Sequence, residues 1–228
     1  MRVNHIIELG CGSAVPSLLL FQYVLREKIP MAFTLADYNA DVIRLVTLPN
    51  LLLTWASTLS AEESAELFPE GNPLLTHQDP TPSPASPQDE NHGDIYLTPA
   101  LLSTFKAHLL HLGITLTLLS GSWTPVPTFT SLIPSSPELN TLILGSETIY
   151  SPASLEGFAD AITAIMRQVR CGKCIVAAKR VYFGVGGSVD GFREACASRG
   201  AVASEIEFEG LESEAGGVRR CLLEVQMC

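Results

Sequence analysis

The stretch Glu8-Leu-Gly10-Cys-Gly12 contains the first residues of this sequence that could do chemistry. Two glycines one residue apart let the chain turn sharply and let a ligand approach the backbone, because neither carries a Cβ. Glu8 precedes the first glycine by two residues in an otherwise apolar run, and burying a carboxylate without a partner is costly. The stretch therefore predicts a tight turn facing a ligand, with a carboxylate that needs a cation or hydrogen-bond donors nearby.

Polar side chains also follow three other apolar runs. Asp37 comes directly after the second run, where a carboxylate in a nucleotide-type fold can accept two hydrogen bonds from ribose hydroxyls. Glu147 and Tyr150, an acid and a phenol three residues apart, can hydrogen-bond a reacting group. The polar groups are Asp37 after 31–36, Ser122 and Trp123 after 114–119, and Ser146, Glu147 and Tyr150 after 139–144.

Strand-like runs and helix-like segments alternate along the chain, which is typical of a mostly parallel sheet with helices on both faces. We predict an α/β, Rossmann-like fold of seven strands that ends in an antiparallel hairpin. Ligands bind such sheets beyond the carboxyl ends of the strands, so the polar groups should meet at one rim. The predicted strands are 3–9, 31–36, 114–119, 139–144, 173–178, 202–208 and 221–225, and the predicted helices are 16–27, 40–53, 98–112, 152–170 and 190–199.

Two parts of the chain should depart from this regular pattern. Pro49 should interrupt or kink the helix at 40–53, because proline lacks the N–H that a helix interior needs. Residues 60–94 contain six prolines, eight acidic residues and no Lys or Arg. Such a segment buries too little apolar surface to offset the entropy of ordering it, so we expect a disordered, acidic, Pro-rich insertion. The 228 residues otherwise suit a single domain.

Charge and composition exclude several classes of function. The net charge of −10 argues against direct binding to nucleic acid, which requires a basic surface. No apolar run approaches the roughly 20 residues of a membrane span. No basic segment precedes an apolar one at the start, so we expect no signal peptide. The single CxxC at 171–174 lacks a second pair or a nearby histidine, so we predict no metal site. We expect a soluble monomer of the cytoplasm, the nucleus or both.

The motifs resemble those of a known class of enzyme. The stretches 6–14 and 35–39, together with Gly-Ser-Trp at 121–123, resemble the seven-β-strand methyltransferases that use S-adenosylmethionine. Four further blocks resemble the protein-histidine methyltransferase family that modifies a ribosomal protein of the large subunit. They are Asp37-Tyr-Asn-Ala-Asp-Val, Leu45-Val-Thr-Leu-Pro-Asn50, Ser146-Glu-Thr-Ile-Tyr-Ser-Pro152 and Tyr182-Phe-Gly-Val-Gly-Gly187.

The resemblance implies a role for each motif. The turn and Glu8 would lie against the methionine portion of the cofactor, Asp37 would hold the ribose, and Ser122-Trp123 would flank the adenine. Related lysine-directed enzymes carry Asp-x-x-Tyr where this chain has Glu147-Thr-Ile-Tyr150, which matches the histidine-directed branch. The resemblance also implies that the substrate is a basic ribosomal protein. The implied cofactor-binding residues are Glu8, Gly10, Cys11, Gly12, Asp37, Tyr38, Asn39, Ser122, Trp123 and Ser146.

A mechanism follows for the histidine substrate. Near pH 7 much of a histidine with an ordinary pKa of about 6.5 is neutral and nucleophilic, so alignment with the methyl donor matters more than a strong base. Our hypothesis is that Glu147 or Tyr150 accepts the N–H of the other ring nitrogen and so selects the tautomer. The glycine-rich segment 182–187 is interpreted either as a plain loop or as a lid on the substrate side.

Three alternatives stay open. A non-catalytic methyltransferase-fold module that binds a ribosomal protein or its chaperone is the main one, and a lysine methyltransferase is another. An NAD-dependent oxidoreductase is disfavoured, because Val15 stands where the third glycine of the dinucleotide fingerprint belongs. Members of the resembled family have a substantial segment before the first strand, and only Met1 to Asn4 precede it here. We therefore expect weak or undetectable cofactor binding by this chain alone.

Overall fold

A central sheet of seven strands organises the protein. The computed structural model of the chain describes residues 2–68, 71–74, 94–207 and 220–228. The strand order is β3-β2-β1-β4-β5-β7-β6, in which the first five strands are parallel and β7 runs antiparallel to both of its neighbours. The predicted Rossmann-like sheet with its C-terminal hairpin is confirmed. The strands are β1 (His5–Leu9), β2 (Met31–Asp37), β3 (Ile114–Ser120), β4 (Asn140–Ser146), β5 (Cys171–Lys179), β6 (Ala201–Ile206) and β7 (Arg220–Met227).

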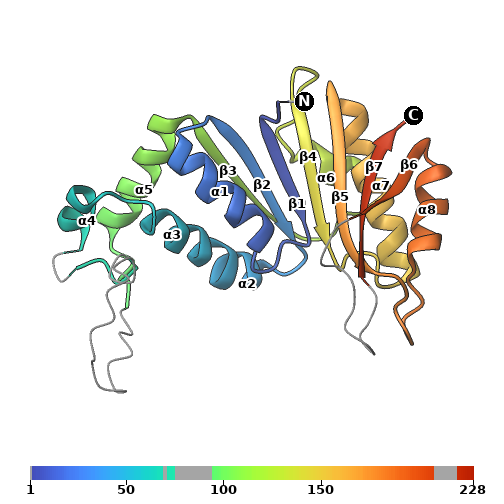
Figure 1. The fold of residues 1–228 in the computed structure, drawn as a ribbon, viewed down its shortest axis with the longest axis horizontal. Coiled ribbons are helices and arrows are strands. Elements are labelled where there is room, and N and C mark those ends of the chain that lie inside the picture. Colours follow the sequence, from blue (N-terminus) through green and yellow to red (C-terminus); the bar gives the residue numbers. More distant parts are fainter. Residues whose placement is uncertain (1, 69–70, 75–93, 208–219) are drawn as a thin grey trace.

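Helices cover both faces of the sheet, as Figure 1 shows. Alternate residues of β1 face opposite layers: Ile6 packs with α1, α3 and α5, whereas Ile7 and Leu9 pack with α6, α7 and α8. In the described part of the chain, no helix has both the length and the apolar character needed to cross a bilayer. The helices are α1 (Val15–Glu27), α2 (Ala40–Val42), η1 (Ile43–Thr47), α3 (Leu48–Ala56), α4 (Ala61–Leu67), α5 (Pro99–Leu112), α6 (Val126–Ser131), α7 (Pro152–Gln168) and α8 (Val189–Ala197).

The strand order reverses at β1, which lies between β2 and β4. The chain moves outward from β1 through β2 to β3, then returns to the other side of β1 with β4 and continues to β5. A ligand-binding crevice forms at such a reversal, because the loops after the two central strands leave in opposite directions. The two-glycine turn directly follows β1, so the sheet topology places it at this point (Figure 1).

The helix predicted at 40–53 continues through Pro49 and changes its pitch before it. The chain forms α2, a π-helical turn η1 and α3 in succession, and the N–H of Leu48 bonds the carbonyl of Ile43, five residues back. A proline ring clashes with the carbonyl four residues before it, and the wider π turn relieves that crowding. The predicted irregularity is present, but it lies on the N-terminal side of Pro49.

Two helices were not expected from the sequence. α4 occupies the start of the segment predicted to be disordered, and a reciprocal capping box between Ser60 and Glu63 begins it. The rest of the segment predicted to be disordered consists largely of residues 69–70 and 75–93, which lie outside the described residues. α6 forms within the Pro-rich connection after β3, where Phe129 is buried in the core.

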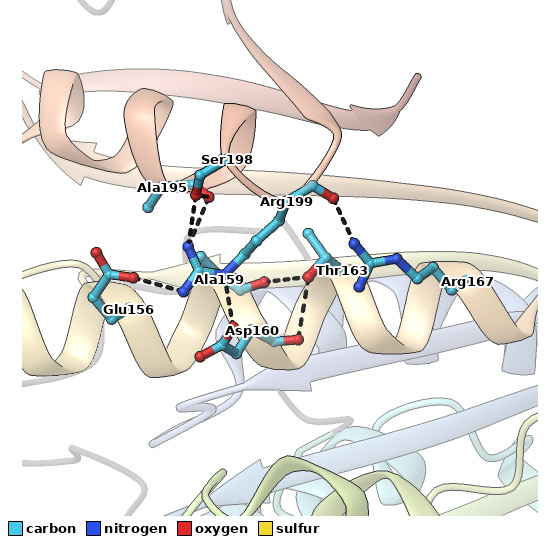
Figure 2. Close-up of polar contacts among 8 residues, drawn as sticks. All are labelled: Glu156, Ala159, Asp160, Thr163, Arg167, Ala195, Ser198 and Arg199. Carbon is cyan, nitrogen blue, oxygen red and sulfur yellow. Dashed lines mark hydrogen bonds and ion pairs between the residues drawn. The ribbon is translucent and has the colours of Figure 1, made fainter.

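Arg199 fastens α8 to α7, as Figure 2 shows. Its guanidinium donates through Nε to Asp160 and through Nη2 to Glu156, both at 2.6 Å, and through Nη1 to the carbonyl of Ala195 at 2.8 Å. Arg167 in turn donates to the backbone carbonyl of Arg199. A cation at the end of α8 also interacts favourably with the helix dipole. One side chain thus satisfies the end of one helix and binds two carboxylates of the other.

Replacing Arg199 with Ala should lower the free energy of unfolding by about 1–2 kcal/mol, because two charge-assisted hydrogen bonds to partly exposed carboxylates are lost. Urea denaturation measures this change. Arg44→Ala is the control, since Arg44 and Asp41 form a pair whose side chains are 72% and 68% exposed. That variant should stay within about 0.5 kcal/mol of the wild type. Equal losses in the two variants would contradict the role assigned to Arg199.

Candidate functional site

The turn after β1 adopts the conformation that the two glycines predict. Gly10 and Gly12 have φ values of 69° and 52°, in the left-handed region that glycine adopts without steric cost. The carbonyl of Ala36 at the end of β2 accepts hydrogen bonds from the N–H groups of both Gly10 and Cys11. α1 then begins with Pro16 in its first turn, as predicted. The strand, turn and helix expected at the start of the chain are therefore confirmed.

Glu8 lies behind this turn. Its side chain is 2% exposed, and Oε2 accepts a hydrogen bond from the N–H of Ser17, in the first turn of α1, at 3.1 Å. Burial raises the pKa of Glu8, and hydrogen bonding from Ser17 opposes that shift. Within the described residues, Glu8 makes no ion pair with a Lys or Arg. The expected hydrogen-bond donor is thus present, whereas the cation that would balance this carboxylate is not supplied by that part of the chain.

Asp37 connects the end of β2 to the turn. Its Oδ2 accepts from the N–H of Gly12 and its Oδ1 accepts from the N–H of Asn39, each at 3.0 Å. Each carboxylate oxygen has a second lone pair, so the side chain can accept further hydrogen bonds from a ligand. Asn39 caps α2, because its side-chain oxygen accepts a hydrogen bond from the N–H of Asp41. Asp37 therefore fixes the turn and still presents acceptors to a ligand.

The π-helical turn η1 holds the other side of the glycine turn. Thr47 donates its hydroxyl to the carbonyl of Gly12 at 2.7 Å, and Asn50 donates its side-chain amide to the carbonyl of Ser13 at 3.0 Å. Cys11 is buried beside Thr47, and burial raises the pKa of its thiol to about 12, which favours the neutral thiol. Neither Thr47, the last residue of η1, nor Asn50, in α3, is predicted as a site residue, although both belong to the family-like block at 45–50.

A cavity of about 520 Å³ opens beside the turn, which is a usual size for a small-molecule site. The four strand ends predicted to share one rim all contribute to it, so the predicted convergence is correct. The predicted residues that line the cavity are Gly10, Asp37, Tyr38, Ser122, Trp123, Ser146, Glu147 and Tyr150. The predicted residues that do not line it are Glu8, Cys11, Gly12 and Asn39, and the lining residues not predicted are Gly121, Thr124, Thr148, Ser151, Ala153, Ser154 and Gly157.

Trp123 forms an apolar wall of this cavity. Its ring packs against Phe158 with 5.6 Å between the ring centroids. A Cβ on Gly10 would lie 3.6 Å from the Trp123 ring and only 3.2 Å from the methyl carbon of Thr148. Gly10 is therefore needed both for its backbone conformation and for the close approach of these two side chains. The result is a flat aromatic surface next to the polar turn.

Glu147 lines the cavity and has an unusual backbone conformation. Its φ of 57° is in the left-handed region, which is uncommon for a residue with a side chain. Its N–H donates to the carbonyl of Ala177 at 2.8 Å and so continues the β4–β5 pairing by one residue. The carboxylate lies 3.6 Å from Nζ of Lys179 and 3.8 Å from Nε of Arg220. These two cations come from β5 and β7, so no local sequence pattern predicts their meeting with Glu147.

The glycine-rich segment 182–187 lies against the backbone beside Tyr150. The N–H of Gly187 donates to the carbonyl of Tyr150 at 3.1 Å, and a Cβ on Gly187 would overlap the carbonyl oxygen of Ile149. Burial raises the pKa of the Tyr182 hydroxyl to about 12, and that hydroxyl accepts from the N–H of Lys179. Residues 182–187 do not line the cavity. Their use as a substrate-side lid stays a prediction.

The fold and the cavity define the class of protein. A sheet of this order, with a glycine turn at the strand reversal and an acid after β2, is a Rossmann-like methyltransferase fold. By sequence, the chain belongs to the family of the curated proteins named histidine protein methyltransferase 1. It is 38% identical to the Saccharomyces cerevisiae protein over 197 residues, covering 83% of this chain and 48% of the relative. It is 34% identical to the Schizosaccharomyces pombe protein over 188 residues, covering 82% and 47%.

The chain spans about half the length of the curated relatives it matches. No family model matches it. The solved structures similar to it include the CurJ carbon methyltransferase, with 10% identity, a TM-score of 0.49, and coverage of 100% of this chain and 49% of that one. The rRNA methyltransferase aviRa from Streptomyces viridochromogenes has 12% identity, a TM-score of 0.48, and coverage of 98% and 76%. Among the described residues, no three or more His, Cys, Asp or Glu side chains are grouped to hold a metal ion.

Replacing Glu8 with Gln should stabilise the protein at pH 7 and have little effect near pH 4. Because the folded-state pKa of Glu8 is raised, the cost of ionising it is absent below the unfolded value of about 4.5 and grows as the pH rises through the folded value. Thermal unfolding between pH 4 and pH 8 measures this trend.

The control for this measurement is Glu63→Gln, for which the opposite trend is expected. Hydrogen bonds from Ser60 lower the pKa of Glu63, so its contribution to stability is present above pH 4.5 and lost as the pH falls. Glu63→Gln should therefore destabilise the protein at neutral pH. A Glu8→Gln variant that followed the same trend would show that the buried carboxylate is stabilising as it stands.

Proposed function

We propose that this chain transfers a methyl group from S-adenosylmethionine to a histidine ring nitrogen of a protein. One observation carries the proposal: a single cavity is lined both by the turn, Asp37 and Trp123 and by the acid and phenol Glu147 and Tyr150. The first set suits a nucleoside-containing cofactor, and the second suits an imidazole. Membership of a family whose named relatives are histidine protein methyltransferases supports the same activity.

The residues of the cavity fit the cofactor in three places. Asp37 has lone pairs free for the ribose hydroxyls, and the Trp123 ring offers a flat surface on which an adenine can stack. Gly10 leaves the backbone open on the methionine side. Glu8 is buried behind the turn and pairs with no Lys or Arg of the described residues, so its carboxylate contributes a negative field that favours a positively charged ligand. When bound, S-adenosylmethionine supplies a methyl group activated by its sulfonium charge.

The protein must then align a neutral imidazole with that methyl group and keep water away. Holding two reactants in position can supply about 7–11 kcal/mol of the barrier, and a histidine of ordinary pKa needs no strong base at neutral pH. The Glu147 carboxylate accepts the N–H of the imidazole nitrogen that is not methylated. It thereby selects the tautomer and stabilises the positive charge that develops on the ring. Tyr150, 49% exposed at the mouth of the cavity, contacts the same ring.

The acceptor that we propose is a basic protein of the large ribosomal subunit. A net charge of −10 favours association with a basic partner through long-range attraction. Such a substrate would be met in the cytoplasm or the nucleus, and a monomer would suffice because all of the proposed cavity residues come from one chain.

The experiment that tests this function incubates the purified protein with methyl-labelled S-adenosylmethionine and a total ribosomal-protein fraction. The labelled residue is then located by mass spectrometry. Label on a histidine ring nitrogen is the expected result. Label on lysine would replace the histidine assignment with a lysine one. Cofactor binding without transfer, or the weak or undetectable binding in calorimetry that the sequence alone predicts, would favour the non-catalytic module.

Glu147→Gln should lower kcat by about 10²-fold, because the amide cannot balance the charge on the imidazole. Tyr150→Phe should lower kcat by about tenfold, the equivalent of one hydrogen bond. Both variants should bind the cofactor with unchanged affinity, which calorimetry checks. Tyr96→Phe is the matched control, since Tyr96 is 77% exposed and does not line the cavity. Wild-type rates for both site variants would remove these residues from the mechanism.

A further inference from the structure

Two cations face one another at the ends of two neighbouring strands beside Glu147. Lys179 is the last residue of β5, Arg220 is the first residue of β7, and the two are direct partners in the antiparallel register. Like charges directly opposite each other in a sheet are destabilising. A pair in this position therefore needs an anion nearby to offset the repulsion.

Glu147 is that anion, and each of its oxygens has its own cation. Oε2 lies 3.6 Å from Nζ of Lys179, and Oε1 lies 3.8 Å from Nε of Arg220. With one positive charge for each oxygen, the plane of the carboxylate has a preferred orientation. We infer that Lys179 and Arg220 are positioning residues that hold the Glu147 carboxylate toward the target histidine. This inference rests on the proposed function.

The arrangement contributes little to folding stability by itself. The side chains of Glu147, Lys179 and Arg220 are 39%, 35% and 60% exposed, and ion pairs this exposed stabilise a protein only slightly. Glu147 also sits in a left-handed backbone conformation that is unfavourable for a residue with a Cβ. Unfavourable local conformations of this kind concentrate at functional sites, where the orientation that they impose is used.

Lys179 is itself held in place by the neighbouring glycine-rich segment. Its backbone N–H donates to the hydroxyl of Tyr182 at 3.2 Å, and its Nζ lies 5.6 Å from the centre of the Tyr182 ring. Gly187, in the same segment, bonds the carbonyl of Tyr150. The acid and the phenol assigned to the target histidine are thus connected, through Lys179 and through the backbone, to a single loop.

The first test compares Lys179→Met with Lys173→Met. Lys173 lies at the opposite end of β5, has a side chain 36% exposed, and pairs with Glu224 of β7 at 2.7 Å, far from the cavity lining. Lys179→Met should lower kcat about tenfold with KM and cofactor affinity within about twofold of wild type. Lys173→Met should leave all three unchanged, and Lys179→Arg should restore most of the rate. Equal kinetics for Lys179→Met and Lys173→Met would overturn the inference.

The second test follows the carboxylate directly and does not depend on activity. In protein labelled with 13C at the glutamate side-chain carboxyl, the Glu147 signal is assigned by its loss in Glu147→Gln. That signal should shift in Lys179→Met and Arg220→Met and stay in place in Lys173→Met. An unmoved signal in both cavity-side variants would overturn the inference, even if the wild-type protein methylates histidine.

A double-mutant comparison separates positioning from a direct role. If Lys179 acts only through Glu147, adding Lys179→Met to Glu147→Gln should cause no further loss of rate. A further tenfold loss would show that Lys179 acts independently. A wild-type protein without transferase activity would instead count against the proposed function, and the carboxyl signal would still decide whether the two cations hold Glu147.

Discussion

The hydrogen bond from the Gly12 N–H to the Asp37 carboxylate is the contact on which the rest of the site depends. It ties the turn after the central strand to the end of the neighbouring strand, at the point where the strand order reverses. The carbonyl of Ala36 strengthens the connection by accepting two N–H groups of the same turn. A turn with two left-handed residues would otherwise be free to move, and a fixed turn is what makes a preformed ligand surface possible.

The other contacts of the turn follow from this constraint. Glu8 secures it from behind through the start of α1, and Thr47 and Asn50 hold its carbonyls from the side of the π turn. With the turn fixed, the missing side chain of Gly10 leaves a space that Trp123 and Thr148 approach closely. The polar wall and the aromatic wall of the cavity are therefore both consequences of the backbone arrangement of this turn.

Much of this site could be predicted from the sequence, because local signals encode it. Apolar runs that alternate with helix-like segments located the strands. Gly10, Gly12 and Asp37 marked the ends of two strands, and the parallel pairing of these strands brings the ends together. The contacts that could not be predicted are non-local. Glu147 meets Lys179 and Arg220 only because of the strand reversal and the register of the hairpin. Glu8 lies behind the cavity because its side chain is on the side of β1 that faces α1. The break assigned to Pro49 was displaced, because a helix can widen a turn instead of ending.

A crystal structure with S-adenosylhomocysteine tests the central claim most directly. The ribose hydroxyls should bond Asp37 while its hydrogen bond to Gly12 persists. The adenine should lie beside Trp123, and the amino-acid portion should lie over Gly10. Glu147 should remain beside Lys179 and Arg220 on the far side of the sulfur. A ligand bound elsewhere, such as the groove between α7 and α8 near Glu194, or an empty cavity at saturating ligand, would contradict the account.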